Sequence, residues 1–280
     1  MKSLASFVLL CFFSAQMGAK TVSEKDKEAL IAFYHAANGN EWKIKWDLSQ
    51  PVTTWFGVEV EEGKIIGLSL ADNNLSGTIS EALFNLTNLI SIDFHKNKLE
   101  GNLAFSISNL KELEVLKLSQ NRLSGKIPAS VSELSKLRDL ELFANELTGE
   151  LPLQIGKLKQ LEILVLSNNK IEGALPVSIY KMDHLQILLL NGNRLSGSLS
   201  SQIANFTALQ NLSLYDNNFE GEVPKELEKL AALSELNLSY NQFSGEVSRN
   251  LVLLDALNMT MLDQNGNPFL LEINQENKLQ

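Results

Sequence analysis

The sequence offers few side chains that could carry out catalysis or bind a metal ion. Its histidines are His35, His95 and His184, and their spacing fits neither a zinc site nor a Ser-His-Asp arrangement. The single cysteine, Cys11, lies in an apolar stretch near the N-terminus, so the rest of the chain has no disulfide and no cysteine-based metal site. We therefore predict a protein without a cofactor and without enzyme activity.

Charged residues recur at a fixed interval, and one carboxylate pair could serve acid–base chemistry. Asp93, Lys117 and Glu141 follow one another at intervals of 24 residues. Two carboxylates such as Asp93 and Glu141 could act in a glycosidase if they faced each other across a bound sugar. Alternating charges on neighbouring strands more often pair with one another on a solvated face. A glycosidase therefore stays as an alternative, which loss of turnover in Asp93→Asn would support.

The interval of 24 residues organises most of the chain. Each unit begins with leucine or isoleucine, asparagine follows eight positions later, and glycine follows four positions after the asparagine. Such a repeat predicts a solenoid of stacked coils, with eight repeats between residues 65 and 256. The asparagines are Asn73, Asn97, Asn121, Asn145, Asn169, Asn193, Asn217, Asn241 and Asn265.

Each recurring residue type has a physical role in such a coil. Leu113, Leu116 and Leu118 are spaced as in a short strand, and strands of successive coils can pair side by side. The asparagine amide can satisfy backbone groups where the chain turns, and glycine permits a backbone conformation that other residues avoid. We predict an α/β solenoid, a right-handed superhelix with a parallel β-sheet on its concave face and an N-terminal helical cap.

Side chains that point away from the core of the concave sheet form the predicted binding surface. Residues alternate between the two faces of a strand, so the variable positions between the leucines point outward. Exposed contiguous apolar area often marks a partner site, although aliphatic residues also simply suit strands, and the sequence leaves both interpretations open. The candidate ligand-binding residues are Phe143, Val165, Leu189, Tyr215, Ile163, Ile187, Lys117 and Glu141.

The two ends of the repeat array are expected to be capped. In residues 20–64, Ser23 and Asp26 form a capping box, and Asn38-Gly39 signals the end of the helix that follows. Trp42, Trp46 and Trp55 then supply apolar area to cover the first coil, with carbohydrate stacking as the alternative. Residues 257–280 are interpreted as a degenerate ninth repeat and a polar tail.

Residues 1–19 are typical of a secretory signal peptide. Lys2 precedes an apolar run that is too short to span a bilayer, and small and polar residues follow it. The expected location is extracellular, or the periplasm or medium in a bacterium. The net charge of −9 and the lack of a basic run disfavour nucleic acid as a partner. No other stretch is long and apolar enough to be a membrane span, and the sequence does not fix the oligomeric state.

Several asparagines lie in Asn-x-Ser/Thr sequons and could carry glycans in a eukaryote. The motif also arises from the repeat itself, as in Asn237-Leu238-Ser239. Glycans on Asn211 or Asn237 would cover the predicted binding face. The six sequon asparagines are Asn74, Asn85, Asn205, Asn211, Asn237 and Asn258.

Two segments of the sequence resemble a known family. The stretch from Trp55 to Gly77, with Gly57-Val58 and Leu68-Ser69-Leu70, resembles the entry into plant-type leucine-rich-repeat proteins, and the unit Leu137–Gln160 resembles their repeat. That class includes ectodomains of receptor-like kinases and secreted polygalacturonase-inhibiting proteins. The cap residues Ala29-Leu30, Asn38-Gly39-Asn40 and Trp42 resemble caps of bacterial, algal and protist members. Thr53 and Val60 stand where plant caps carry cysteines.

These features together predict a secreted recognition module that binds a protein or a polysaccharide on its concave face. The resemblance adds an alternative, a proteinaceous inhibitor of a secreted cell-wall hydrolase. A surface-adhesion or ice-facing protein would use a flat, regular face, and the irregular strand-face side chains count against it.

Overall fold

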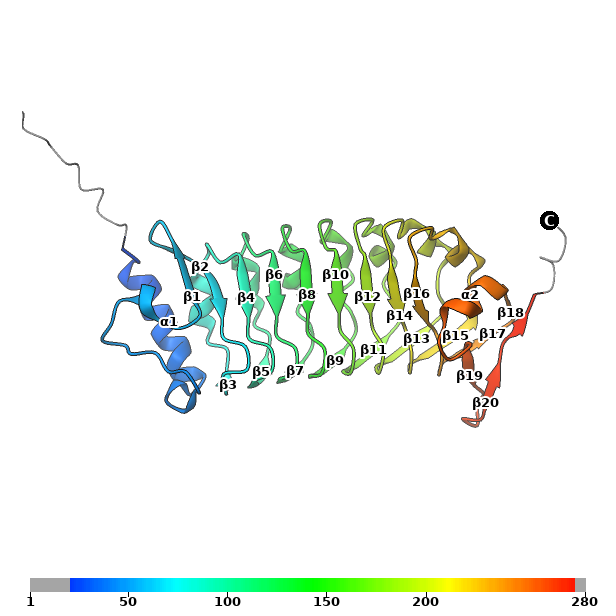
Figure 1. Cartoon of the computed structure of the whole chain (residues 1–280), viewed down its shortest axis with the longest axis horizontal. Coiled ribbons are helices and arrows are strands. Elements are labelled where there is room, and N and C mark those ends of the chain that lie inside the picture. The colour runs from blue at the N-terminus through cyan, green and yellow to red at the C-terminus, as the bar shows by residue number, and fades with distance from the viewer. Residues whose placement is uncertain (1–20, 275–280) are drawn as a thin grey trace, which may run out of the picture.

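The computed structural model describes residues 21–274 of the chain. Its main feature is a row of stacked coils whose strands lie side by side and form a sheet (Figure 1). Neighbouring strands pair residues 24 apart, for example Leu140 with Leu164 and Leu164 with Leu188, so the sequence period is the coil. The predicted α/β solenoid with a parallel sheet and an N-terminal helix is confirmed. The proposed signal peptide, residues 1–19, lies outside the described residues.

The concave face is a nine-stranded sheet that is parallel except for its first pair. Buried leucines at the middle of each strand stack from coil to coil and form one continuous core. The strands, in order across the sheet, are β1 (Val58–Glu61), β2 (Lys64–Ser69), β4 (Ser91–Asp93), β6 (Val115–Lys117), β8 (Asp139–Glu141), β10 (Ile163–Val165), β12 (Ile187–Leu189), β14 (Asn211–Ser213) and β16 (Glu235–Asn237).

A second parallel arrangement of eight short strands lies where the chain leaves the asparagine turn, which the sequence analysis did not predict. Each strand is only three to five residues long, too short to show an alternating pattern in the sequence. These strands are β3 (Ser76–Thr78), β5 (Lys98–Asn102), β7 (Arg122–Gly125), β9 (Glu146–Gly149), β11 (Lys170–Gly173), β13 (Arg194–Gly197), β15 (Asn218–Glu222) and β17 (Gln242–Ser244).

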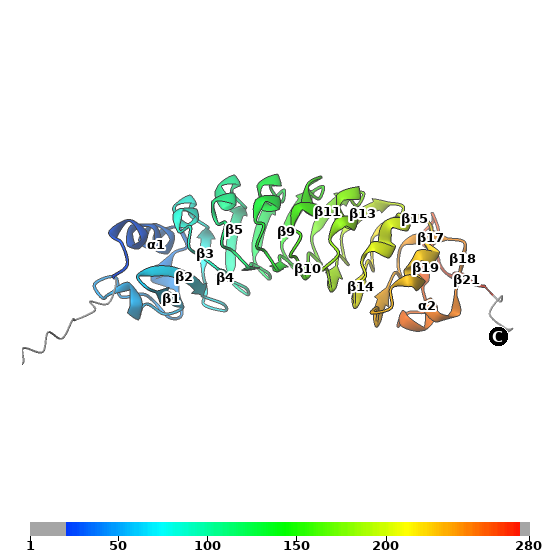
Figure 2. The same cartoon turned by 90° about the horizontal axis from the view of Figure 1, so that it is seen from above.

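Short 3-10 helices return the chain to the concave sheet and lie on the outer side of the arch (Figure 2). The N-cap residues of three of these helices are Pro128, Pro176 and Pro224. The N–H that proline lacks would not form a hydrogen bond within the helix at this position. These helices are η3 (Glu81–Asn85), η4 (Phe105–Asn109), η5 (Ala129–Glu133), η6 (Ile155–Lys157), η7 (Val177–Lys181), η8 (Ser201–Asn205) and η9 (Lys225–Lys229).

Buried and half-buried asparagines form the ladder expected from the sequence. In Asn169, Oδ1 accepts a hydrogen bond from the Leu147 amide (3.0 Å), and Nδ2 donates to the carbonyls of Leu142 and Leu166 (3.0 Å each). Each such side chain therefore joins its own coil to the one before it. The same pattern recurs at Asn97, Asn121, Asn145, Asn193, Asn217 and Asn241.

The repeat glycines are required by the backbone. Gly125 has a φ of +73°, and a Cβ on it would lie 2.5 Å from Oδ1 of Asn102 in the preceding coil. Both the left-handed conformation and the close approach exclude a larger residue without local rearrangement.

The N-terminal cap follows the sequence prediction. Helix α1 (Glu24–Ala36) begins at Ser23, whose hydroxyl accepts from the Asp26 amide (3.1 Å), and ends before Asn38 in the left-handed conformation. The cap also contains η1 (Gly39–Glu41) and η2 (Val52–Thr54). Trp42, Trp46 and Trp55 are all buried, so they cover the first coil and are not available to stack on a carbohydrate.

The C-terminal end departs from the sequence period. Extension of the period would place Leu257 in the core and Asn265 in the ladder, but both are exposed, whereas Met259 and Met261 are fully buried. The carboxylate of buried Asp255 accepts from the Leu238 amide (2.8 Å) at the edge of β16, where a further strand would pair. The terminal elements are α2 (Arg249–Leu254), β18 (Glu246–Val247), β19 (Thr260–Leu262), β20 (Pro268–Leu270) and β21 (Glu272–Ile273).

Candidate functional site

The concave face presents three columns of side chains, one from each outward position of the strands. Ile163 is paired with Ile187 in the first column and Val165 with Leu189 in the second, so these four aliphatic residues form one patch on β10 and β12. They are half-buried, because each is partly covered by its neighbours on the sheet. The structure thus brings together the four central residues of the candidate site.

The two aromatic candidates lie on either side of this patch. Phe143 and Tyr215 are both half-buried and occupy the third column, separated from each other by Ser167 and Asn191. The ring of Tyr215 lies 5.2 Å from that of Tyr240. Phe143 and Tyr215 therefore bound the aliphatic patch and do not form a single aromatic cluster.

The third column is less open than the strand alternation predicts. Ser119, Ser167 and Ser239 were expected to point outward, but they are buried. The Ser239 hydroxyl donates to Asp255 (3.1 Å), and that of Ser167 donates to Oδ1 of Asn191 (2.6 Å). The short hydroxyl side chains of Ser167 and Ser239 are bonded to neighbouring side chains and do not project from the face, which removes these positions from the surface.

Charged residues gather beside the patch, on β4, β6 and β8. Nζ of Lys117 lies 2.7 Å from Oε1 of Glu141 and 2.9 Å from Oδ2 of Asp139, so the predicted pairing of Lys117 with Glu141 is confirmed. Asp93 does not join them; its Oδ1 lies 2.7 Å from Nδ1 of His95. The one lysine thus faces two carboxylates on the adjacent strand.

A second row of charges, one position before each strand, also pairs across the sheet. Arg138 lies 3.0 Å from Glu162 and 3.8 Å from Glu114. Both rows therefore behave as cross-strand ion pairs on a partly solvated face, as expected from their alternating signs. The glycosidase alternative loses support, because Glu141 is held by Lys117 and Asp93 by His95.

Burial and charge act in opposite directions within this cluster. Burial raises the pKa of Asp139, whose Oδ1 is buried without a hydrogen-bond partner, even though Lys117 favours the ionised form. Burial alone would lower the pKa of Lys117, but its hydrogen bonds to Glu141 and Asp139 and their charges together raise that pKa above the usual value. The lysine stays charged, whereas burial disfavours the ionised form of Asp139.

We expect Asp139→Asn to become relatively more stabilising as the pH rises. A folded-state pKa above the unfolded value means that the wild-type protein loses stability as Asp139 ionises, between the usual aspartate pKa of about 3.8 and the raised folded value. Denaturant midpoints of both proteins, measured from pH 3 to pH 7, should show a difference that grows in the variant's favour and then levels off. A difference that shrinks as the pH rises would contradict this assignment.

A groove continues from the aliphatic patch to the C-terminal end of the concave face. It has a volume of about 410 Å³ and is bounded by Leu189, Tyr215 and Asn237 on the sheet and by Leu254 and Ala256 beyond it. Leu254 and Ala256 could not be predicted as groove residues, because the period places them on the return leg of the eighth repeat, away from the concave sheet. The sequence analysis missed Asp139, which could have been found as the residue two positions before Glu141 on the same face.

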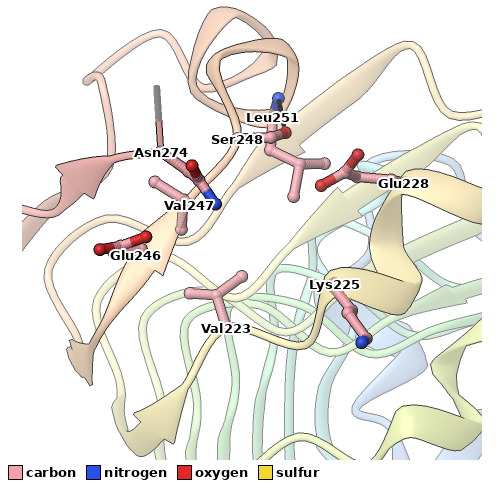
Figure 3. Close-up of a pocket in the computed structure, with 8 residues that line it drawn as sticks. All are labelled: Val223, Lys225, Glu228, Glu246, Val247, Ser248, Leu251 and Asn274. Atoms are coloured by element: carbon pink, nitrogen blue, oxygen red, sulfur yellow. Dashed lines mark hydrogen bonds between the residues drawn. The ribbon is translucent and has the colours of Figure 1, made fainter. Parts of the chain in front are cut away.

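A second hollow of about 260 Å³ lies between η9 and the C-terminal elements (Figure 3). Lys225 and Glu228 come from η9, Glu246 comes from β18, and Leu251 comes from α2. Its lining mixes charges of both signs with apolar side chains. No group of three or more metal-binding side chains occurs there or elsewhere in residues 21–274.

The sequon asparagines differ in their surroundings. Asn85 and Asn258 are exposed. Nδ2 of Asn74 donates to the Glu41 carbonyl (2.7 Å) and that of Asn205 to the Tyr180 carbonyl (3.2 Å), so a glycan on either leaves a single Nδ2 hydrogen to make this bond. Asn211 and Asn237 lie on the concave face, where Asn211 donates to Glu235.

Comparison with known proteins agrees with this geometry. A family model described as a leucine-rich repeat region matches residues 88–263, and one described as Leucine Rich Repeat matches residues 64–86. Within residues 21–274, no helix has the length and apolar character needed to cross a membrane.

Solved structures with the same fold include receptor ectodomains and a smaller plant protein. The crystal structure of PEPR1-AtPEP1 is 27% identical with a TM-score of 0.74, and the match covers 86% of this chain and 34% of that one. The ectodomain of GASSHO1/SCHENGEN3 from Arabidopsis thaliana, in complex with CASPARIAN STRIP INTEGRITY FACTOR 2, is 26% identical with a TM-score of 0.72, covering 86% and 32%. A plant ice-binding protein is 28% identical with a TM-score of 0.71, covering 86% of each chain.

The chain spans about a third of the length of the two receptor chains that it matches. The family models together cover the coils from β2 through β19, which are the elements that carry the concave face. The chain belongs to the leucine-rich-repeat family, in its plant-type form.

Proposed function

We propose that the protein is a secreted recognition module that binds an extended peptide segment of a partner protein along its concave face. The observation that carries the proposal is the order in which side chains of different chemical type follow one another across the strands of that face. In the second column, charged side chains occupy β4 to β8, aliphatic side chains occupy β10 and β12, and the polar side chains of Ser213 and Asn237 occupy β14 and β16. In the first column, Glu235 adds a carboxylate on β16. A ligand that crosses the strands would meet these three environments in turn.

The length of this surface suits a short peptide. Seven strands from β4 to β16, at about 4.8 Å each, give roughly 29 Å, which an extended peptide of about nine residues would span. Asp93, Asp139 and Glu141 outnumber Lys117, so a basic ligand residue is favoured there. An aliphatic ligand residue would then lie over Val165 and Leu189. Two of the similar structures, PEPR1-AtPEP1 and GASSHO1/SCHENGEN3 in complex with CASPARIAN STRIP INTEGRITY FACTOR 2, support this mode of use.

Selection of peptides from a random displayed library on the purified chain tests the proposal. We expect enriched peptides to place a basic residue before an aliphatic one, and Phe143→Glu and Leu189→Glu each to weaken their binding by about tenfold or more, which corresponds to about 1.4 kcal/mol. Affinity can be measured by fluorescence anisotropy of labelled peptides.

The matched control is Ile44→Glu, which introduces the same charge at an exposed apolar residue of the N-terminal cap. Its affinity should equal that of the wild type. If the enriched peptides bind both concave-face variants as tightly as the wild type, the site lies elsewhere. If a panel of polysaccharides binds and no peptide is enriched, the ligand class is wrong.

The hydrolase-inhibitor alternative would use the same face on a larger partner. It is tested by adding the protein to secreted polysaccharide hydrolases and measuring their activity, with Leu189→Glu as the comparison. Inhibition that this variant abolishes would favour the alternative over peptide recognition.

Similarity to a plant ice-binding protein concerns the fold, and the side chains here argue against ice as the ligand. Successive coils of the second sheet present Lys98, Arg122 and Glu146, which differ in charge and shape. The concave face is equally irregular. Unaltered ice growth in the presence of the protein is the expected result.

A further inference from the structure

An apolar stripe runs along the outer side of the arch, opposite the concave face. Phe105, Leu153 and Val177 are 71%, 70% and 62% exposed, and Ala129 is exposed between the first two. These four residues, which we call the convex stripe, follow one another at intervals of 24 residues in four consecutive coils. Phe105, Ala129 and Val177 begin η4, η5 and η7, and Leu153 lies two residues before η6. The 3-10 helices lie on the outer side of the arch (Figure 2). Glu81 and Ser201 hold the equivalent position in the coils on either side.

Single exposed apolar residues are common on soluble proteins, but a row of four is a different observation. Neighbouring coils pack through their 3-10 segments, η4 on η5, η5 on η6 and η6 on η7, so the four side chains form one continuous strip. Contiguous exposed apolar area of this kind marks an interaction surface.

Charges on both sides of the convex stripe alternate from one coil to the next. On the side of the second sheet stand Lys126 and then Glu150; on the other side stand Glu133 and then Lys157. All four are exposed. Within residues 21–274, Lys126, Glu150 and Lys157 form no ion pair, whereas Glu133 lies 3.2 Å from Lys111. Around Ala129 and Leu153, the charges on the two middle coils therefore alternate in sign both along the row of coils and across the stripe.

We propose that the convex stripe is the interface of a homodimer, in which two copies meet with their coils in opposite order about a twofold axis between the coils of Ala129 and Leu153. A twofold axis that lies in the interface and is perpendicular to the row of coils reverses the order of the coils in the second copy. The edge of the stripe next to the second sheet then meets the same edge of the partner subunit. Lys126 then faces Glu150 of the partner subunit, and Glu133 faces Lys157 of the partner subunit. Leu153 fills the space left by Ala129 of the partner subunit, and Phe105 lies against Val177 of the partner subunit.

Other symmetric arrangements fit less well. An axis through the coil of Ala129 would place Lys126 against its own copy, and an axis through the coil of Leu153 would place Glu150 against its own copy. An axis parallel to the row of coils also matches opposite charges, Lys126 with Glu133, but it sets Leu153 on Leu153 and Ala129 on Ala129. In that arrangement the two Leu153 side chains collide and the two Ala129 side chains leave a gap. Close packing therefore favours the arrangement in which the coils run in opposite order.

The strip of four coils is short compared with a stable interface, which buries about 800 Å² on each partner. We therefore expect a reversible dimer with a dissociation constant on the order of 10–100 µM, which dissociates on dilution. The two symmetric Lys126–Glu150 contacts should make it weaker in high salt.

Sedimentation velocity of the purified chain over a range of concentrations tests this interface. The wild-type mass should rise toward that of a dimer as concentration increases, and Leu153→Lys should remain monomeric. Lys126→Glu places like charges together at two symmetric positions, so dimerisation should weaken by about tenfold or more. Adding Glu150→Lys to Lys126→Glu should restore it, because the exchanged charges again face each other.

Circular dichroism of each variant establishes that the fold is intact, and these substitutions lie at exposed positions. A wild-type chain that stays monomeric overturns the proposal. Failure of the Lys126→Glu, Glu150→Lys double variant to recover, or recovery by Lys126→Glu with Glu133→Lys instead, overturns the opposed order. Peptide binding by monomeric Leu153→Lys is measured separately, so this interface and the concave-face function can fail independently.

Discussion

Replacing Trp46 by alanine should lower the free energy of unfolding by about 3–5 kcal/mol. Trp46 lies at the centre of the aromatic cap, with its ring 4.9 Å from Trp55, 5.0 Å from Trp42 and 5.7 Å from Tyr34. Its Nε1 donates to the Phe56 carbonyl (2.8 Å). Alanine removes the contacts, opens a cavity among the remaining rings and leaves that carbonyl without its donor.

This loss should appear first at the N-terminal end. Each coil of a solenoid is stabilised by its neighbours, so an unstable cap exposes the coil beneath it before the rest unfolds. Phe33, which stacks on Phe94 at 5.0 Å, connects the cap directly to the second coil as well. Amide exchange should therefore accelerate around β2 and β4 in Trp46→Ala while the coils near β14 keep their protection.

Two variants calibrate this prediction. Trp46→Phe keeps most of the apolar contact and loses the hydrogen bond, so its cost should be clearly smaller than that of alanine. Ile44→Ala alters an exposed side chain of the same cap and should change stability by less than about 0.5 kcal/mol. If Trp46→Ala leaves both the unfolding midpoint and the exchange pattern near β2 unchanged, the cap does not stabilise the array as described.

The second large effect is expected from the asparagine ladder: Asn169→Leu should cost at least about 2 kcal/mol. The side chain is 9% exposed and serves one backbone N–H and two carbonyls. Leucine has a similar volume, so the packing change is small. The cost comes mainly from the Leu147 amide, which loses its acceptor in the interior. The Leu142 and Leu166 carbonyls each lose one donor and keep the other, from Asn145 and Asn193.

A second substitution separates the donor role of this side chain from its size. Asn169→Asp keeps an acceptor for the Leu147 amide but turns a carboxylate oxygen toward the two carbonyls, so it should destabilise at least as much as leucine. Asn109→Ala, at an exposed asparagine of the return leg, is the control and should stay within about 0.5 kcal/mol of the wild type. Equal midpoints for Asn169→Leu and the control in chemical denaturation would show that the ladder contributes no stability.

The sequence alone predicted the features that depend on residues close together or on strict repetition. Ser23 and Asn38 marked the ends of α1 because caps are local. The buried leucines and the ladder asparagines followed from the period, since every coil solves the same packing and hydrogen-bonding problem. For the same reason Ile163, Ile187, Val165 and Leu189 could be expected to lie together.

Other features could not be read from the period. The second sheet was missed because strands of three to five residues carry no alternation of their own. The burial of Ser167 and Ser239 was missed because a hydroxyl can turn to a neighbouring coil or to Asp255. The last core residues of the array do not lie where the 24-residue period places them, because Met259 and Met261, and not Leu257, complete the core.

What the sequence by itself determined is therefore the coil: its length, its apolar interior and the polar ladder that joins it to the next. The tertiary structure decided what happens between side chains of different coils. Only stacking brings Lys117 against Asp139 and Glu141, closes the groove with Leu254, and lines up Phe105, Ala129, Leu153 and Val177 on the outer side. The physical reason is that the leucine and asparagine positions repeat in every coil and can be read from one unit, whereas a surface depends on which variable residues, 24 positions apart, meet when coils stack.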